Sequence, residues 1–122
     1  MIGPETYEEF QEARRRFPGY FLGYLNIQPT DLEVPKKIRR IAEDGFYGIK
    51  LYLSNWRGIH VYDEQMYPIY EEVLWNKLLV ICHFGISIGG DVDLRSGNPI
   101  DIQIPARDFP DLNFMIAHFG AG

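Results

Sequence analysis

The chain has 122 residues, of which 46% are hydrophobic and 24% are charged, and its formal net charge is −5. This length predicts one domain with one core, and the acidic balance argues against a nucleic acid or an anionic membrane as partner. Cys82 is the one cysteine, which excludes an intrachain disulfide and fits a reducing compartment, so we expect a cytoplasmic protein. No apolar stretch approaches the roughly 18 residues of a membrane span.

The first half of the chain predicts two helix–strand units. Phe10, Ala13 and Phe17 recur at helical spacing and predict a first helix. The stretch 20–27 is rich in aromatic and branched residues and predicts a strand. A second apolar stripe, which a glycine follows, predicts the next helix, and residues 47–53 predict the second strand.

The second half of the chain repeats this order. Asp63 is placed to cap a third helix, and Asn76 is placed to end it in the left-handed conformation. Residues 78–83 form an apolar run that predicts the third strand. Asn98 followed by proline begins a short fourth helix, and residues 112–118 predict the fourth strand.

Helix–strand units of roughly 25–35 residues predict an α/β fold with parallel strands and right-handed crossovers. Two architectures fit this order: a doubly wound open sheet and part of a (β/α)8 barrel. The open sheet usually carries a glycine-rich nucleotide turn, and neither GxGxxG nor GxxxxGK[ST] occurs here. A barrel places its chemistry at the carboxyl ends of its strands.

Polar side chains fall at those carboxyl ends. His83 and His118 each close an apolar run, and each is followed by Phe and Gly. Lys50 and Tyr52 share one face of the second predicted strand, where a lysine is costly unless it faces a polar cavity. The barrel explains these positions together. Since neighbouring strands are about 4.8 Å apart, we expect the two imidazoles within roughly 5–9 Å of each other, with Lys50 beside them.

Three stretches, in this order, are "YGIKLYL", "LLVICHFG" and "ARDFPDLNFMIAHFG". In these stretches the chain resembles the amidohydrolase-2 family of metal-dependent TIM-barrel hydrolases, which includes the aminocarboxymuconate-semialdehyde decarboxylase type. The resemblance runs from about Thr6 to Gly122. It implies that the predicted strands are the third to sixth of a barrel. We therefore expect residues 1–122 to form a single partial TIM-barrel domain.

The resemblance also implies roles for the two histidines. It makes His83 a metal ligand and His118 a catalytic acid or base beside the metal. The cofactor would be a divalent ion, with zinc favoured, and the substrate a small carboxylated or cyclic organic compound. A histidine on an apolar strand is, taken alone, more often a satisfied core residue, and that interpretation stays open for both.

Four further residues are candidates for substrate contact. Lys50 and Tyr52 lie on the second strand, and Arg57 and Arg95 lie on loops that would cover the site. Plain solvent exposure is the alternative for both arginines, and a carboxylated, metal-bridging state is an alternative for Lys50. The family often has histidine where this chain has Tyr52, so that histidine's role has no counterpart here.

Two parts of the family pattern are absent from the sequence. It contains no His-x-His pair, and the late metal-binding aspartate has no counterpart. Since a full barrel takes about 250 residues, we expect a fragment of an enzyme or a chain that a partner completes. Two functions stand: the catalytic middle of a metal-dependent hydrolase or decarboxylase, and a non-catalytic half-barrel that pairs through its open sheet edges. Either one predicts a homo-oligomer.

Overall fold

The structure, a computed structural model, describes residues 6–56, 58–85 and 92–118. Its sheet has four strands, β1 (Tyr24–Asn26), β2 (Gly48–Leu51), β3 (Leu79–His83) and β4 (Phe114–Ala117). Every neighbouring pair is parallel and the spatial order is β1-β2-β3-β4, the same as the order in the chain. This arrangement confirms the predicted α/β fold and excludes an order that reverses midway, as a doubly wound sheet has.

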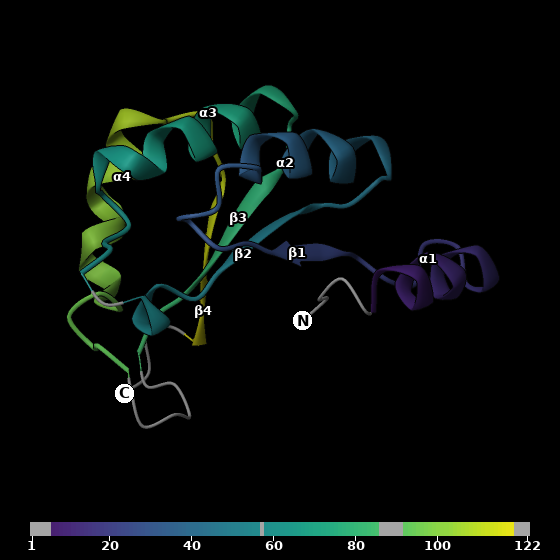
Figure 1. Ribbon diagram of the computed structural model, residues 1–122, viewed down its shortest axis with the longest axis horizontal. Coiled ribbons are helices and arrows are strands. Elements are labelled where there is room, and N and C mark those ends of the chain that lie inside the picture. The colour runs from purple at the N-terminus through teal and green to yellow at the C-terminus, as the bar shows by residue number, and fades with distance from the viewer. Residues whose placement is uncertain (1–5, 57, 86–91, 119–122) are drawn as a thin grey trace.

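The α-helices in the described part of the chain are α1 (Tyr7–Arg16), α2 (Val34–Glu43), α3 (Tyr67–Trp75) and α4 (Gln103–Asp108). Helices α2, α3 and α4 lie along one side of the sheet, as Figure 1 shows. Short 3-10 helices occupy Leu53–Asn55, Glu64–Met66 and Pro99–Ile102. Asn98 begins the last of these as predicted, because its side-chain oxygen accepts a hydrogen bond from the Ile100 N–H.

Helix α1 is tied to the end of α2. The Tyr7 hydroxyl donates a hydrogen bond to the Asp44 carboxylate, and the Arg14 guanidinium donates to the Asp44 carbonyl at 2.5 Å. The rings of Tyr7 and Phe10 pack against Phe46, with centroids 5.4 and 4.9 Å away. These contacts hold the first helix beside the second although α1 itself contributes no fully buried residue.

The strands are shorter than the apolar runs that predicted them. The first was expected over 20–27 but starts at Tyr24, because pairing with β2 begins where Tyr24 meets Gly48. Tyr20, Phe21 and Leu22 before β1 have exposed side chains, and Tyr20 is 82% exposed. The second predicted strand, 47–53, ends at Leu51. The aromatic and branched composition therefore predicted the positions of the strands correctly but overestimated their lengths.

The predicted cap at Asn76 is wrong. Asn76 keeps a φ of −85°, and the left-handed position falls one residue later, at Lys77 with a φ of 56°. The Asn76 amide instead donates to the carbonyl and the carboxylate of Glu72. The Asn76 side chain thus caps the last turn of α3, and Lys77 adopts the left-handed conformation that follows.

The two faces of the sheet differ sharply in burial. The face toward the helices carries fully buried residues, among them Ile49, Leu51, Val80 and Cys82, and they pack in one core with Ile38, Ile41, Tyr70 and Val73. Each such aliphatic side chain contributes about 1.5–3 kcal/mol through burial. On the other face, which is the inner face of a barrel, Lys50 is half-buried and Met115 is 48% exposed.

Among the described residues, no helix combines the length and the apolar character that crossing a bilayer requires. The expectation of a single domain over 1–122 stays a prediction.

Candidate active site

Three aromatic side chains meet at the carboxyl ends of β2, β3 and β4. Tyr52 follows β2, His83 is the last residue of β3, and His118 directly follows β4. The Tyr52 ring stacks on His83 with centroids 5.0 Å apart and planes at 28°. The His83 and His118 rings meet edge to face, with centroids 4.9 Å apart and planes at 71°. The two imidazoles therefore lie at the near limit of the expected separation and share one end of the sheet.

The contact between the imidazoles depends on a backbone turn at His118. Ala117 pairs with His83, so these two side chains point to the same face. If β4 continued in extended form, the next side chain would point to the opposite face. His118 has a φ of 62°, in the left-handed region, and this turn brings its ring back to His83. Such a conformation costs a residue with a β-carbon about 1–2 kcal/mol and is typical of functional positions.

The two histidines have different surroundings. His83 is 8% exposed, whereas His118 is exposed. A buried imidazole held between two rings has a fixed orientation, which suits a ligand. An exposed imidazole beside it can exchange protons with a bound molecule. The arrangement therefore allows two distinct tasks for two residues of the same type.

Lys50 lies next in this row of side chains. Its Nζ is 5.0 Å from the centroid of the Tyr52 ring, a cation–π distance. No described residue forms an ion pair or a hydrogen bond with the Lys50 ammonium. Burial lowers the pKa of Lys50 from its ordinary value, because the charged form loses hydration. Lys50 and Tyr52 thus share the inner face, as predicted.

Cys82, which precedes His83 in β3, takes no part in the chemistry of the two histidines. Its side chain is fully buried on the face toward the helices. Burial raises the pKa of the Cys82 thiol to about 12, since a thiolate would be desolvated there. The thiol is a small core side chain and not a metal ligand.

Of the two candidate arginines, Arg95 is not brought to the rings by its described contacts. The Arg95 side chain is 89% exposed and pairs with Asp93 at 3.2 Å. That pairing lowers the pKa of Asp93. The Asp93 N–H donates to the Ser54 carbonyl at 2.9 Å, which fastens the loop after β3 to the loop after β2. Arg57 lies outside the described residues, so its expected contact stays a prediction.

The loops after β2 and β3 contain buried polar atoms that were not predicted from the sequence. Within the described residues, the Ser54 and Ser96 hydroxyls, the Trp56 indole nitrogen and the His60 Nδ1 are buried without a hydrogen-bond partner. His60 stacks on Tyr62, with ring centroids 5.1 Å apart. No pattern in the sequence marks these atoms, because their burial depends on how the loops pack.

The donor set fits a divalent metal only in part. Imidazole is a preferred ligand for zinc and similar ions, and two imidazoles meet here. Within residues 6–56, 58–85 and 92–118, however, no group of three His, Cys, Asp or Glu side chains could hold an ion. A protein metal site needs about three or four ligands, so His83 and His118 would supply part of one.

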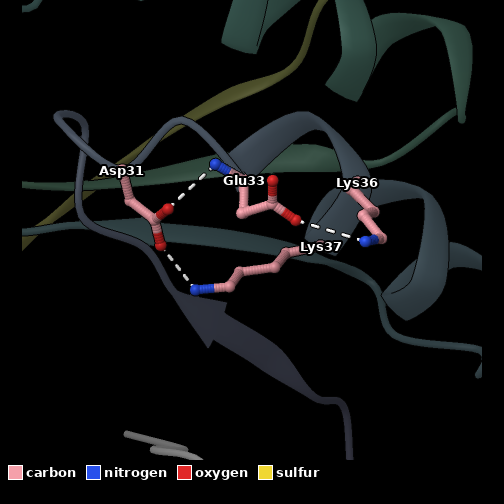
Figure 2. Close-up of polar contacts among 4 residues, drawn as sticks. All are labelled: Asp31, Glu33, Lys36 and Lys37. Atoms are coloured by element: carbon pink, nitrogen blue, oxygen red, sulfur yellow. Dashed lines mark hydrogen bonds and ion pairs between the residues drawn. The ribbon is translucent and has the colours of Figure 1, made fainter.

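A separate cavity of about 600 Å³ lies at the free edge of β1, where its walls come from α1, α2 and Trp56. Leu25 and Asn26, which point to opposite faces of β1, both line it. Beside it, Asp31 accepts hydrogen bonds from the Glu33 N–H and the Lys37 ammonium, as Figure 2 shows. This cavity is two strands away from His83.

Parallel strands in chain order, with polar side chains gathered at their carboxyl ends, define the class of β/α-barrel proteins. Residues 4–122 match the family model described as amidohydrolase, and the chain belongs to that family. No curated protein matches the chain.

Solved structures give the same fold. An uncharacterized TIM-barrel protein from Bordetella bronchiseptica is 26% identical with a TM-score of 0.71, and the match covers 88% of this chain. A 5-carboxyvanillate decarboxylase from Novosphingobium aromaticivorans, solved with manganese and a nitrobenzoic acid, is 21% identical with a TM-score of 0.67 over 93% of this chain. A second structure of that decarboxylase is 20% identical with a TM-score of 0.68 over 93% of this chain. The chain spans 38% of the length of each.

Proposed function

We propose that the chain is the central part of a metal-dependent hydrolase or decarboxylase that acts on a small carboxylated or cyclic organic compound. The observation that carries the proposal is the His83–His118 pair at the carboxyl ends of β3 and β4, with ring centroids 4.9 Å apart. Family membership supports it. So does the fold shared with a decarboxylase solved with manganese.

In this proposal the two histidines have separate roles. His83 holds a divalent metal ion, because its imidazole is buried and oriented by the Tyr52 ring. When bound, the ion supplies Lewis-acid chemistry that activates water or polarises an oxygen of the substrate. His118 accepts or donates the proton that moves during the reaction, because its exposed ring can reach a bound molecule. Zinc is the ion we propose, and manganese is its first competitor.

The remaining contacts belong to the same proposal. Arg57 and Arg95 would approach a substrate carboxylate from the loops above the strand ends. We also propose a cytoplasmic protein, since the one cysteine is buried and no disulfide is available.

Metal content tests the roles of the histidines, measured in a protein that carries the whole barrel. We expect His83→Ala to lose most of the bound metal. His118→Ala should keep the metal and lose turnover by about 10²–10⁴-fold, which is what a general acid or base contributes. The matched control is His60→Ala, which removes a histidine that stacks on Tyr62, outside the row of rings. Equal metal content in wild type and His83→Ala would contradict the proposal.

A non-catalytic half-barrel is the second candidate. The observation in its favour is apolar surface at a sheet edge that no other described strand covers: on β4, Met115 is 48% and Ile116 37% exposed. Such a surface suits pairing with another chain. Stoichiometric metal content decides between the two, because a half-barrel that only assembles would bind no stoichiometric metal and show no loss on His83→Ala.

A further inference from the structure

The Lys50 ammonium lies on the inner face of the sheet and has no part in the roles proposed for the two histidines. The Lys50 ammonium has neither a carboxylate nor a hydrogen-bond partner among the described residues, and it lies 5.0 Å from the centroid of the Tyr52 ring. A half-buried ammonium without a counter-ion is costly. An aromatic face compensates for only part of that cost, about 0.5–2 kcal/mol. The position is therefore suited to an anion that arrives from outside.

The sheet register shows what surrounds this ammonium. Lys50 pairs with Asn26 on one side and Ile81 on the other, and Ile81 pairs with Met115. Side chains in register point to the same face. Across the inner face the row thus changes from polar, at Asn26 and Lys50, to apolar, at Ile81 and Met115.

The same row fixes where this ammonium lies relative to the histidines. The Tyr52 ring has the Lys50 ammonium and the His83 ring as neighbours, each 5.0 Å from its centroid. Two groups that each lie 5.0 Å from one centroid are at most about twice that distance apart. One small aromatic molecule can therefore reach both the ammonium and the buried imidazole, with a different polar group at each.

We propose that Lys50 binds an anionic oxygen group of the substrate that is separate from the reacting group, while the apolar body of the substrate lies over Ile81 and Met115. The substrate class is then a cyclic or aromatic compound with two polar ends, one anionic group held by Lys50 and one group that reacts at His83 and His118. Tyr52 is a positioning residue, because its ring contacts both the ammonium and the buried imidazole. The proposal rests on the proposed function for the location of the reacting end.

Ligand binding without metal tests this proposal apart from the proposed function. The probes are benzoate, the neutral isostere benzamide and acetate, titrated into the metal-free chain and followed by NMR shifts of its backbone amides. We expect benzoate to shift the amides around β2, and to bind about tenfold more tightly than benzamide because of the charge. We also expect it to bind more tightly than acetate, because its ring covers apolar side chains.

Variants of Lys50 locate the charge. Lys50→Met should weaken benzoate binding about tenfold and remove the preference over benzamide, whereas Lys50→Arg should keep both. The matched control is Lys36→Met, which removes an exposed lysine of α2 that pairs with Glu33 on the outer layer (Figure 2). Circular dichroism and the unfolding midpoint check that each variant is folded.

Three results would overturn the proposal: no benzoate binding by the wild type, equal affinity in wild type and Lys50→Met, or equal affinity for benzoate and benzamide. Tyr52→Leu separates positioning from mere packing. It should weaken benzoate binding, while Tyr52→Phe, which keeps the ring, should restore it. The failure of the metal assignment at His83 would leave all of these results unchanged, since no metal is present.

Discussion

The His118 ring meets the His83 ring edge to face, 4.9 Å away, because the backbone of His118 adopts a φ of 62° at the point where β4 ends. An extended residue at this position would send its side chain toward the helices. The pairing of the two imidazoles is thus produced by one left-handed residue, and the chain keeps a histidine where glycine would be relaxed.

This strain predicts an unusual order of stabilities at position 118. His118→Gly should leave the free energy of unfolding unchanged or raise it, because glycine has no β-carbon to strain. His118→Val should lower it by about 1–2 kcal/mol, because a branched side chain is least tolerated in this region. Urea denaturation measures both. Met115→Val is the control inside β4, where valine suits the strand, and equal tolerance of valine at both positions would refute the explanation.

Gly48 is predicted to be irreplaceable by alanine. A β-carbon there would lie 2.1 Å from the Leu79 carbonyl oxygen, a backbone atom that β3 holds in place. We expect Gly48→Ala to lower the free energy of unfolding by about 3 kcal/mol or more, as severe overpacking does. Gly19→Ala is the comparison, because its β-carbon meets nothing within 4 Å and only its φ of 78° opposes the change. Its cost should be about 1–2 kcal/mol, so similar losses in the two variants would contradict the steric argument.

The ion pair at the start of α2 predicts a titration shift. Hydrogen bonds from the Lys37 ammonium and the Glu33 N–H lower the pKa of Asp31 below its ordinary value. A carboxyl with a lowered pKa in the folded state stabilises the fold above its unfolded pKa, and this contribution is lost as the pH falls through the folded pKa. Lys37→Met should therefore raise the Asp31 pKa, measured from the carboxyl carbon shift in NMR.

The control for that titration is Lys36→Met. Lys36 pairs with Glu33 and makes no contact with the Asp31 carboxylate in Figure 2. An unchanged Asp31 midpoint in Lys37→Met, or an equal change in both variants, would show that the ion pair does not set this pKa.

Assembly is the fourth prediction. The exposed side chains of Met115 and Ile116 lie on β4, whose outer edge is unpaired within the described residues. Because such edges pair with other chains, we expect a homodimer or higher oligomer in sedimentation at micromolar concentration. Met115→Lys should shift the population toward monomer. Trp75→Lys, which changes an exposed apolar side chain on α3, should not. A wild-type monomer with a cooperative melt would disprove the expectation.

The approximate positions of the strands and of the two histidines could be predicted from the sequence, but the packing of the side chains around them could not. Apolar runs ending in His83 and His118 predicted neighbouring strand ends, since parallel strands in chain order follow from helix–strand alternation. The Tyr52 ring between Lys50 and His83 could not be predicted, because the way a side chain packs beyond a strand end depends on the turn that follows. The left-handed conformation of His118 could not be predicted either, since in a sequence mainly glycine and asparagine indicate such conformations.

Strand order that equals chain order has a consequence for how this protein is made. Each strand needs only the strand that came before it, so β2 can pair with β1 before β3 has been synthesised. As a ribosome releases the chain from its N-terminus, each new β/α unit finds its neighbour already in place. Each pairing still closes a connection that contains a helix, as between Tyr24 and Gly48 or Val80 and Phe114, so it forms more slowly than a hairpin would. The sheet can therefore form one β/α unit at a time. At every stage the strand added last presents the edge on which the next strand pairs.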